Sequence, residues 1–100
     1  MSVNIQDEVF AALASLPRRR TLAFLAQTAL STTDLAERFG MSAPAVSRHL
    51  AVLQRAGLVF AERQGKRVLY RLRREALLDA LGTLASAVDG PLRRAPREAI

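Results

Sequence analysis

A short helix with chemically specified ends, over residues 42–57, constrains the fold of this chain more than any other stretch. Ser42 can accept a hydrogen bond from a free N–H group of the first turn, and Pro44 lies where its missing N–H costs little. Gly57 can adopt the left-handed conformation that ends a helix. The apolar residues between these ends recur at spacings of four and three, and they are Val46, Leu50 and Leu53. This pattern predicts one buried face and one free face.

A second helix that ends in glycine precedes this one. Residues 33–40 read TDLAERFG, with Gly40 as the helix breaker and alternative N-terminal caps at Ser31, Thr32 and Thr33. Two short helices joined by a turn that contains glycine form a helix-turn-helix, whose second helix enters the major groove of DNA. Because an unrelated helical hairpin would have the same turn, this prediction depends on the residues that follow.

The residues after Gly57 predict a β-hairpin with a basic tip. Residues 58–63 and 67–72 are rich in strand-forming types, and the loop between them contains Gly65. Alternate residues of the second strand can pack on the helices, and they are Val68, Tyr70 and Leu72. Such a hairpin is called a wing, and its tip residues would contact phosphates or enter the minor groove; they are Arg63, Lys66 and Arg67. The alternative is that these charges only prevent strand aggregation.

Apolar periodicity predicts two helices before this unit. Residues 5–16 carry one apolar stripe, formed by Ile5, Val9, Leu13 and Leu16. Pro17 ends this helix and can begin the next, which is expected to run to about residue 29. The three arginines at 18–20 are unfavourable to the dipole at the start of that helix. They indicate either a contact with an anion such as phosphate or a solvated face with one arginine in an ion pair.

A coiled-coil-like seam is expected over residues 74–88, where leucines and a valine recur at spacings of four, three and four. With the first helix, this seam could cover the chain's own core or a second subunit. We expect a second subunit, because the central helices and the wing supply a small core of their own. The candidates for the dimer interface are Val9, Leu13, Leu77, Leu81, Leu84 and Val88. Residues 1–88 then form one domain, and residues 89–100, which lack periodicity, form a flexible tail.

Charge is concentrated in one block of the sequence. The net charge is +6, and residues 48–74 contain eight Lys or Arg residues but only one acidic residue, Glu62. This block indicates binding to a polyanion, although a basic surface that favours solubility is the alternative. The chain has no cysteine, which excludes disulfides and thiolate metal sites. No apolar run approaches the roughly 20 residues of a membrane span, and no signal peptide is recognisable, so we expect a cytoplasmic protein.

The order of these features resembles one bacterial family. The string LSTTDLAERFGMSAPAVSRHLAVLQRAGLV, preceded by LASLPRRRTLAFL and followed by GKRVLYRL, is similar to the ArsR/SmtB family of winged helix-turn-helix repressors. The resemblance implies a mainly α fold with a β-hairpin wing, in the order α-α-α-α-β-β-α. It also implies a homodimer built on the first and last helices, which represses transcription from an operator until a signal releases it.

The resemblance carries over to particular residues of the recognition helix. The family pattern serine-valine-serine-x-histidine-leucine falls on residues 45–50, with Ala45 as a departure. Ser47 and Arg48 are then the candidates for base contacts, and His49 is either a phosphate contact or a residue between core and groove. The full set of DNA-binding candidates is Ser42, Ala43, Ala45, Ser47, Arg48, His49, Arg63, Lys66 and Arg67.

No metal, cofactor or catalytic activity is expected. The cysteine positions of the family's metal sensors are Ser31 and Thr33 here, and the last helix has Asp79 and Asp89 without a histidine. The chain resembles the cysteine-free branch of the family, and this resemblance implies an inducer that is an organic molecule, another protein or unknown. An enzyme is disfavoured by a single histidine, no thiol and no phosphate-binding glycine loop. The alternative to a DNA-binding repressor is a winged-helix module for protein–protein interaction, without sequence-specific DNA binding.

Overall fold

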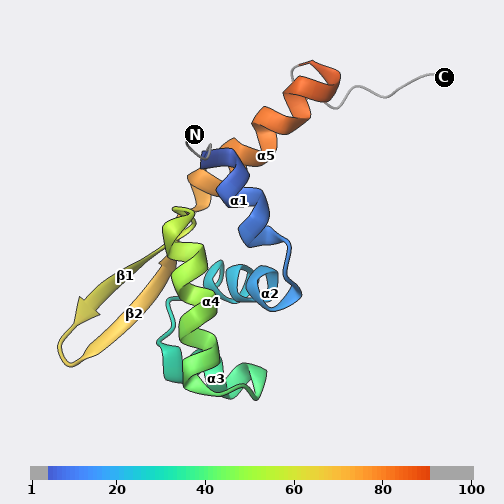
Figure 1. The fold of residues 1–100 in the computed structure, drawn as a ribbon. Helices are drawn as coiled ribbons and strands as arrows, with labels where there is room; N and C mark the ends of the chain where they lie inside the picture. Colours follow the sequence, from blue (N-terminus) through green and yellow to red (C-terminus); the bar gives the residue numbers. More distant parts are fainter. Residues whose placement is uncertain (1–4, 91–100) are drawn as a thin grey trace.

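Five helices and one two-stranded hairpin make up the part of the chain that the structure describes, residues 5–90 of a computed structural model (Figure 1). In chain order they are α1 (Ile5–Leu13), α2 (Leu16–Leu25), α3 (Thr32–Phe39), α4 (Ala43–Arg55), β1 (Val59–Gln64), β2 (Arg67–Leu72) and α5 (Arg74–Asp89). This order confirms the expected mainly α fold with a β-hairpin wing. Helix α5 includes Asp89, so the expected start of a tail at this residue was wrong, and residues 91–100 of the expected tail lie outside the described residues.

The ends of α4 are those that the sequence specifies. Ser42 adopts an extended backbone conformation, and its Oγ accepts a hydrogen bond from the N–H of Ala45 at 3.2 Å. Gly57 has a φ of 77°, which a residue with a side chain rarely adopts. The predicted apolar stripe is buried, since Val46, Leu50 and Leu53 are at most 2% exposed. The helix therefore packs on one face and leaves the other free.

The boundary between α1 and α2 differs from the sequence-based prediction. Helix α1 ends at Leu13, and Ser15 caps α2 by accepting a hydrogen bond from the N–H of Arg18 at 3.3 Å. Leu16 therefore begins α2 and is 50% exposed, so its assignment to the apolar stripe of the first helix was wrong. A serine cap followed by Pro17 starts the new helix one residue earlier than the proline alone indicates.

Helix α2 also ends earlier than expected, at Leu25 rather than near residue 29. The chain turns after this point, with the N–H of Gln27 bonded to the carbonyl of Phe24 at 3.0 Å. Leu30 then forms an isolated antiparallel bridge with Tyr70 of β2, with N···O distances of 2.8 and 3.2 Å. This pairing requires an extended backbone, which a longer α2 would prevent.

The wing is an antiparallel hairpin in which Val59 pairs with Leu72 and Gln64 pairs with Arg67. Its loop is therefore the two residues Gly65 and Lys66, and Gln64 belongs to β1 rather than to the loop. At the base, Val59, Tyr70 and Leu72 pack on the core. Val68, near the tip, is 36% exposed, so the prediction that it packs on the helices was wrong. The strands extend beyond the helices that would cover it (Figure 1).

One hydrophobic core joins the helices to the base of the wing. It consists of Val9, Ala12, Leu22, Leu25, Leu30, Leu35, Val46, Leu50, Leu53, Ala56, Leu58, Val59 and Ala80. Helix α5 contributes the buried Ala80, with Ala76 and Leu77 packed beside it. The rest of α5 projects away from the body of the protein (Figure 1). Its apolar side chains are therefore left uncovered by the rest of residues 5–90.

Candidate nucleic-acid interface

The free face of α4 begins at its N-terminal cap. Ser42, Ala43, Ser47 and Arg48 are exposed, whereas Ala45 is half-buried. Small side chains at the first turn allow the end of this helix to approach the floor of a groove about 12 Å wide. Arg48 follows as a long cation with donors suited to a guanine edge, and Ser47 can donate to or accept from either base type.

His49 lies at the border between this face and the core. The ring is half-buried, and its Nδ1 is 3.4 Å from Nη1 of Arg18. Because a guanidinium can only donate, Nδ1 accepts, which places the proton of the neutral ring on Nε2. Burial lowers the pKa of His49 below 6.5, and the charges of Arg18 and Arg48 lower it further. His49 is therefore neutral near pH 7, with an N–H group still available as a donor.

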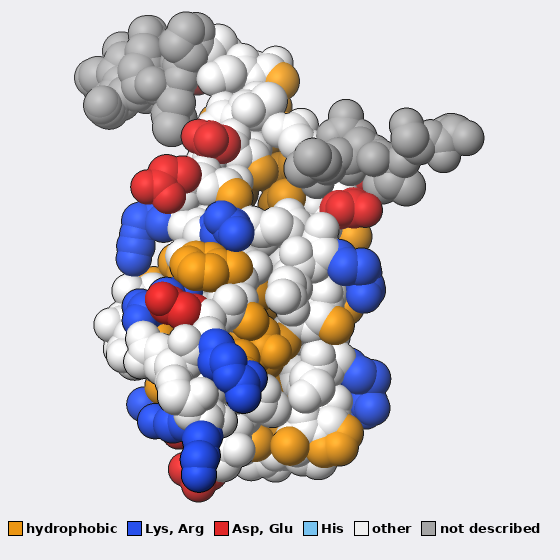
Figure 2. Space-filling view, turned by 90° about the vertical axis from the view of Figure 1, so that its left-hand side faces the viewer, with side chains coloured by type: hydrophobic (Ala, Val, Ile, Leu, Met, Phe, Trp, Pro, Cys, Tyr) orange, Lys and Arg blue, Asp and Glu red, His pale blue; other side chains and the backbone are white. Residues whose placement is uncertain are grey.

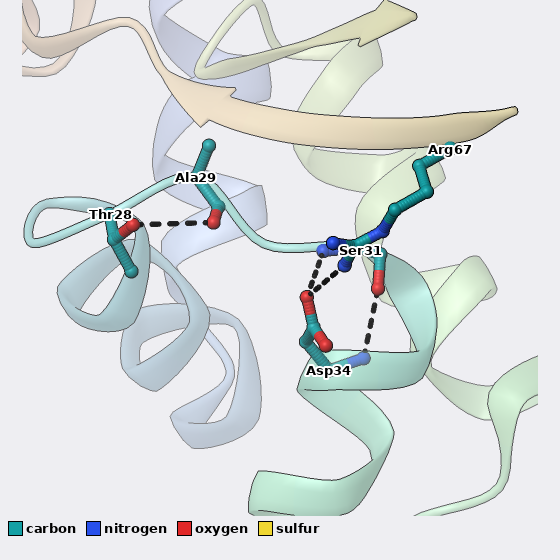
Figure 3. Close-up of polar contacts among 5 residues, drawn as sticks. All are labelled: Thr28, Ala29, Ser31, Asp34 and Arg67. Atoms are coloured by element: carbon teal, nitrogen blue, oxygen red, sulfur yellow. Dashed lines mark hydrogen bonds and ion pairs between the residues drawn. The ribbon is translucent and has the colours of Figure 1, made fainter. Parts of the chain in front are cut away.

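The wing presents two kinds of basic residue. Arg63 and Lys66 are exposed at the distal end of the hairpin. Arg67 instead reaches back to α3, where its Nη2 lies 2.9 Å from Oδ2 of Asp34 (Figure 3). Its side chain remains 61% exposed. The three predicted wing residues therefore differ, because one of them also fixes the wing to the helix-turn-helix.

Asp34 serves two purposes with one carboxylate. Oδ2 accepts the backbone N–H of Ser31 at 3.0 Å, and Ser31 Oγ accepts the N–H of Asp34 at 3.1 Å, which completes a capping box (Figure 3). These bonds, followed by the charge of Arg67, hold the pKa of Asp34 below 3.8. The sequence showed Ser31 as one of three alternative caps, and the structure selects it.

Two arginines at the start of α2 bind the end of α1, a role that the sequence analysis did not predict. Arg18 donates to the carbonyl oxygens of Ala12 and Ala11 at 2.6 and 3.2 Å, and Arg19 donates to that of Leu13 at 2.6 Å. These carbonyls end α1, where cations are favourable. Arg18 and Arg19 are therefore not simply solvated, and their position six to seven residues after the carbonyls that they bind, just beyond the end of α1, was the available signal.

Positive charge is spread widely over the side of the molecule toward which the wing points. Figure 2 shows Lys and Arg side chains over the body and acidic side chains among them, including several toward the α5 end. One acid, Glu62, is paired with Arg71 across the hairpin. Arg73 stacks over the ring of Phe60 with its guanidinium carbon 4.6 Å from the ring centre. Arg71 and Arg73 thus stabilise the wing as well as contributing charge.

The predicted dimer residues divide into two groups. Leu81, Leu84 and Val88 on α5 are 43%, 49% and 78% exposed, as an unpaired seam requires. Val9 is only 2% exposed and belongs to the core of its own protomer. Leu13 and Leu77 are partly buried against the same core. The assignment of Val9 to a dimer surface is therefore corrected, because its side chain is already covered.

Within residues 5–90, no group of three or more His, Cys, Asp or Glu side chains could hold a metal ion. Ser31, at one of the positions where metal sensors of the resembled family carry cysteine, is the cap of α3. None of the described helices is both long and apolar enough to span a membrane.

A capped helix-turn-helix followed by a basic wing defines a winged helix-turn-helix DNA-binding protein. A MarR family model matches residues 15–67, from the cap of α2 to the start of β2. The regulator KmtR of Mycobacterium tuberculosis is 46% identical over 87 residues, covering 83% of this chain and 67% of that protein. The repressor SdpR of Bacillus subtilis is 29% identical, covering 83% and 92%.

Solved structures give the same result. An ArsR-like regulator from Rhodococcus sp. RHA1 matches with a TM-score of 0.78 and 32% identity, over 84% of this chain and 79% of that one. A homodimeric winged helix-turn-helix domain of Mb0332 from Mycobacterium bovis matches with a TM-score of 0.68 and 31% identity, over 83% and 77%. The chain belongs to the ArsR/SmtB family and is a DNA-binding transcriptional regulator.

Proposed function

We propose that this chain is a homodimeric repressor that binds a palindromic operator, each subunit placing α4 in a major groove and the wing beside it. The observation that carries this proposal is the exposed face of α4, with Ser47 and Arg48 on it, close in the chain to a basic hairpin. Repression is supported by the relative SdpR, which is named a transcriptional repressor. A partner of this kind places the protein with the chromosome, in the cytoplasm.

Dimerisation is supported by the uncovered side chains of α5. Leu78, Leu81, Leu84 and Val88 are all more than 40% exposed, which leaves an apolar stripe on a helix that projects from the core. A protein of 100 residues buries a modest fraction of its surface, so pairing two such stripes contributes to stability. The neighbour Mb0332 is described as a homodimer.

The individual contacts follow from exposure and chemistry. Arg48 and Ser47 read base edges, while Ser42, Ala43 and Ala45 allow close approach of the first turn. Arg63 and Lys66 contact phosphates, and Arg67 does so with the donors that Asp34 leaves free. His49 donates its Nε2–H to a phosphate without taking up a proton.

An inducer, either an organic molecule or a protein, would release the operator. A hollow of about 420 Å³ lies between α1, the end of α4 and α5, lined by Ala56, Ala76 and Ala80 together with the charged Glu8, Arg55 and Asp79. This volume falls within the range of small-molecule sites, about 300–1,000 Å³. We place an organic inducer there, and a thermal-shift screen with the variant Ala76→Leu as control tests this placement.

Selection of bound fragments from the source genome tests the main proposal. We expect fragments that share a palindrome with half-sites about 10 base pairs apart. The logarithm of the affinity should fall with the logarithm of salt concentration by about 0.9 per phosphate neutralised. Affinity that ignores both sequence and salt would support the alternative, a winged-helix module for protein–protein interaction.

A further inference from the structure

A single side chain ties the end of α1 to the middle of α4. Arg18 places Nε 2.6 Å from the carbonyl oxygen of Ala12 and Nη2 3.2 Å from that of Ala11. Its third nitrogen, Nη1, lies 3.4 Å from Nδ1 of His49. Each nitrogen of the guanidinium thus has an acceptor, and the acceptors belong to two different helices.

The α1 end of this link is a backbone contact. Helix α1 has nine residues, and its last carbonyls have no hydrogen-bond donors within the helix. The guanidinium is a rigid planar group, so it holds two adjacent carbonyls in a defined geometry. Because the acceptors are backbone atoms, a movement of α1 moves Arg18 with it.

The α4 end of the link lies beside the residues that face DNA. His49 directly follows Arg48 and precedes Leu50, which is 1% exposed. Apolar packing holds α4 against the core but is not directional. The contact between Arg18 and His49 is directional, so it adds a constraint on the rotation of the helix about its axis to the one set by the buried stripe.

The neighbouring arginines do not make this link. Arg19 is exposed, and its Nη1 donates to the carbonyl of Leu13, so its contact ends on α1. Arg20 is exposed on the next position of α2. A matched comparison is therefore available, because Arg18 and Arg19 carry the same charge and both cap α1.

We propose that Arg18 is a positioning residue that sets the orientation of α4 relative to α1 and thereby the spacing of operator half-sites that the dimer accepts. This inference rests on the proposed function, in which α5, the helix that packs against α1, forms the dimer interface and α4 enters the groove. A rotation of α4 against α1 displaces the recognition helices of both subunits at once. Specificity for spacing then depends on a residue that need not touch DNA.

The test compares Arg18→Gln with Arg19→Gln in the full chain. Each variant is bound to the selected operator, to operators with one base pair inserted or removed between the half-sites, and to random DNA at the same salt concentration. We expect Arg18→Gln to lose about tenfold on the selected operator, as for a hydrogen bond to a charged group, and much less on random DNA. The differences between its affinities for the three operator spacings should become smaller than those of the wild type. Arg19→Gln should keep the wild-type preference.

A double-mutant cycle that combines Arg18→Gln with His49→Gln tests whether Arg18 acts on DNA binding through His49. If Arg18 acts through His49, the double variant binds the selected operator about as weakly as the weaker single variant, and additive losses would overturn the proposal. Circular dichroism and the mass of the dimer are measured for each protein. If Arg18→Gln does not fold, Arg18→Lys replaces it in the cycle, since lysine keeps the charge but cannot reach three acceptors in fixed geometry.

Failure of the proposed function and failure of the role assigned to Arg18 give different results. A wild-type protein without preference for any fragment overturns the proposed function itself. A wild-type protein whose spacing preference is shared in full by Arg18→Gln overturns only the role of Arg18. Equal losses for Arg18→Gln and Arg19→Gln also overturn it, because they would reflect the missing charge alone.

Discussion

Oδ2 of Asp34 receives both Nη2 of Arg67, at 2.9 Å, and the backbone N–H of Ser31, at 3.0 Å. One oxygen thus joins the N-terminal cap of α3 to the far strand of the wing. Asp34 and Arg67 lie 33 positions apart in the chain, so the contact between them closes a long loop. The bridge between Leu30 and Tyr70 lies on the same side of β2 and supports the wing nearer its base.

The first prediction concerns this junction. Asp34→Asn keeps an oxygen for the capping box but removes the charge that pairs with Arg67. We expect only a small loss of thermal stability, because the side chain of Arg67 is 61% exposed and that of Asp34 is 31% exposed, so solvent screens the pair. Amide hydrogens near the wing tip should exchange faster. Glu62→Gln is the control, since it removes the charge that pairs with Arg71 within the hairpin and leaves α3 untouched. Equal effects on the tip would contradict a special role for Asp34.

The second prediction concerns pH. The pKa of His49 is lower in the folded protein than 6.5, chiefly through burial and then through Arg18 and Arg48. Below pH 6.5 the unfolded chain therefore binds a proton more readily than the folded one, and the free energy of unfolding decreases as pH falls through the folded pKa. The free energies of unfolding of the wild type and of His49→Gln, measured in urea, should therefore change differently with pH only below pH 6.5. His49 is the only histidine, so a single NMR titration gives its pKa directly.

The third prediction concerns the wing tip. Lys66→Ala combined with Arg63→Ala should weaken binding to operator and random DNA alike, because phosphate contacts carry no sequence information. The slope of log affinity against log salt should become shallower by about 0.9 for each lost contact. Arg20→Ala combined with Arg38→Ala removes two charges from exposed helical positions and should change the slope less. An unchanged slope in the wing variant would remove the wing from the interface.

Local chemistry explains what the sequence could predict. The ends of α4 depend on Ser42 and Gly57, whose effects act over a few residues, and both were predicted correctly. The roles of Arg18 and Arg67 depend on acceptors 31 and 33 residues away, which periodicity cannot locate. The assignment of Val9 failed for a related reason, since a helical stripe does not show whether the same chain or a second one covers it.

The fourth prediction concerns the dimer. Leu81→Asp places a carboxylate on the seam of α5, where the leucine is 43% exposed in the protomer. We expect monomers with poor operator affinity and a folded helix-turn-helix, because this residue lies outside the core cluster. Light scattering measures the mass. Val68→Asp is the control for the dimer mass alone, as an apolar residue of the wing with similar exposure. A dimer that persists in Leu81→Asp would refute the seam as the interface.

The fifth prediction distinguishes a base-specific contact of Arg48 from a contact with phosphate alone. A guanidinium that binds a guanine edge with two hydrogen bonds is worth about 1–3 kcal/mol of discrimination against other bases. Arg48→Ala should therefore narrow the gap between operator and random DNA by that amount, with the loss focused on one base position in each half-site. Arg55→Ala, in the last turn of the same helix, removes an equal charge far from the N-terminal end and should leave the gap intact. An equal loss on both DNAs in Arg48→Ala would show that Arg48 contacts only phosphate, and specificity would then depend on Ser47 and the shape of the DNA.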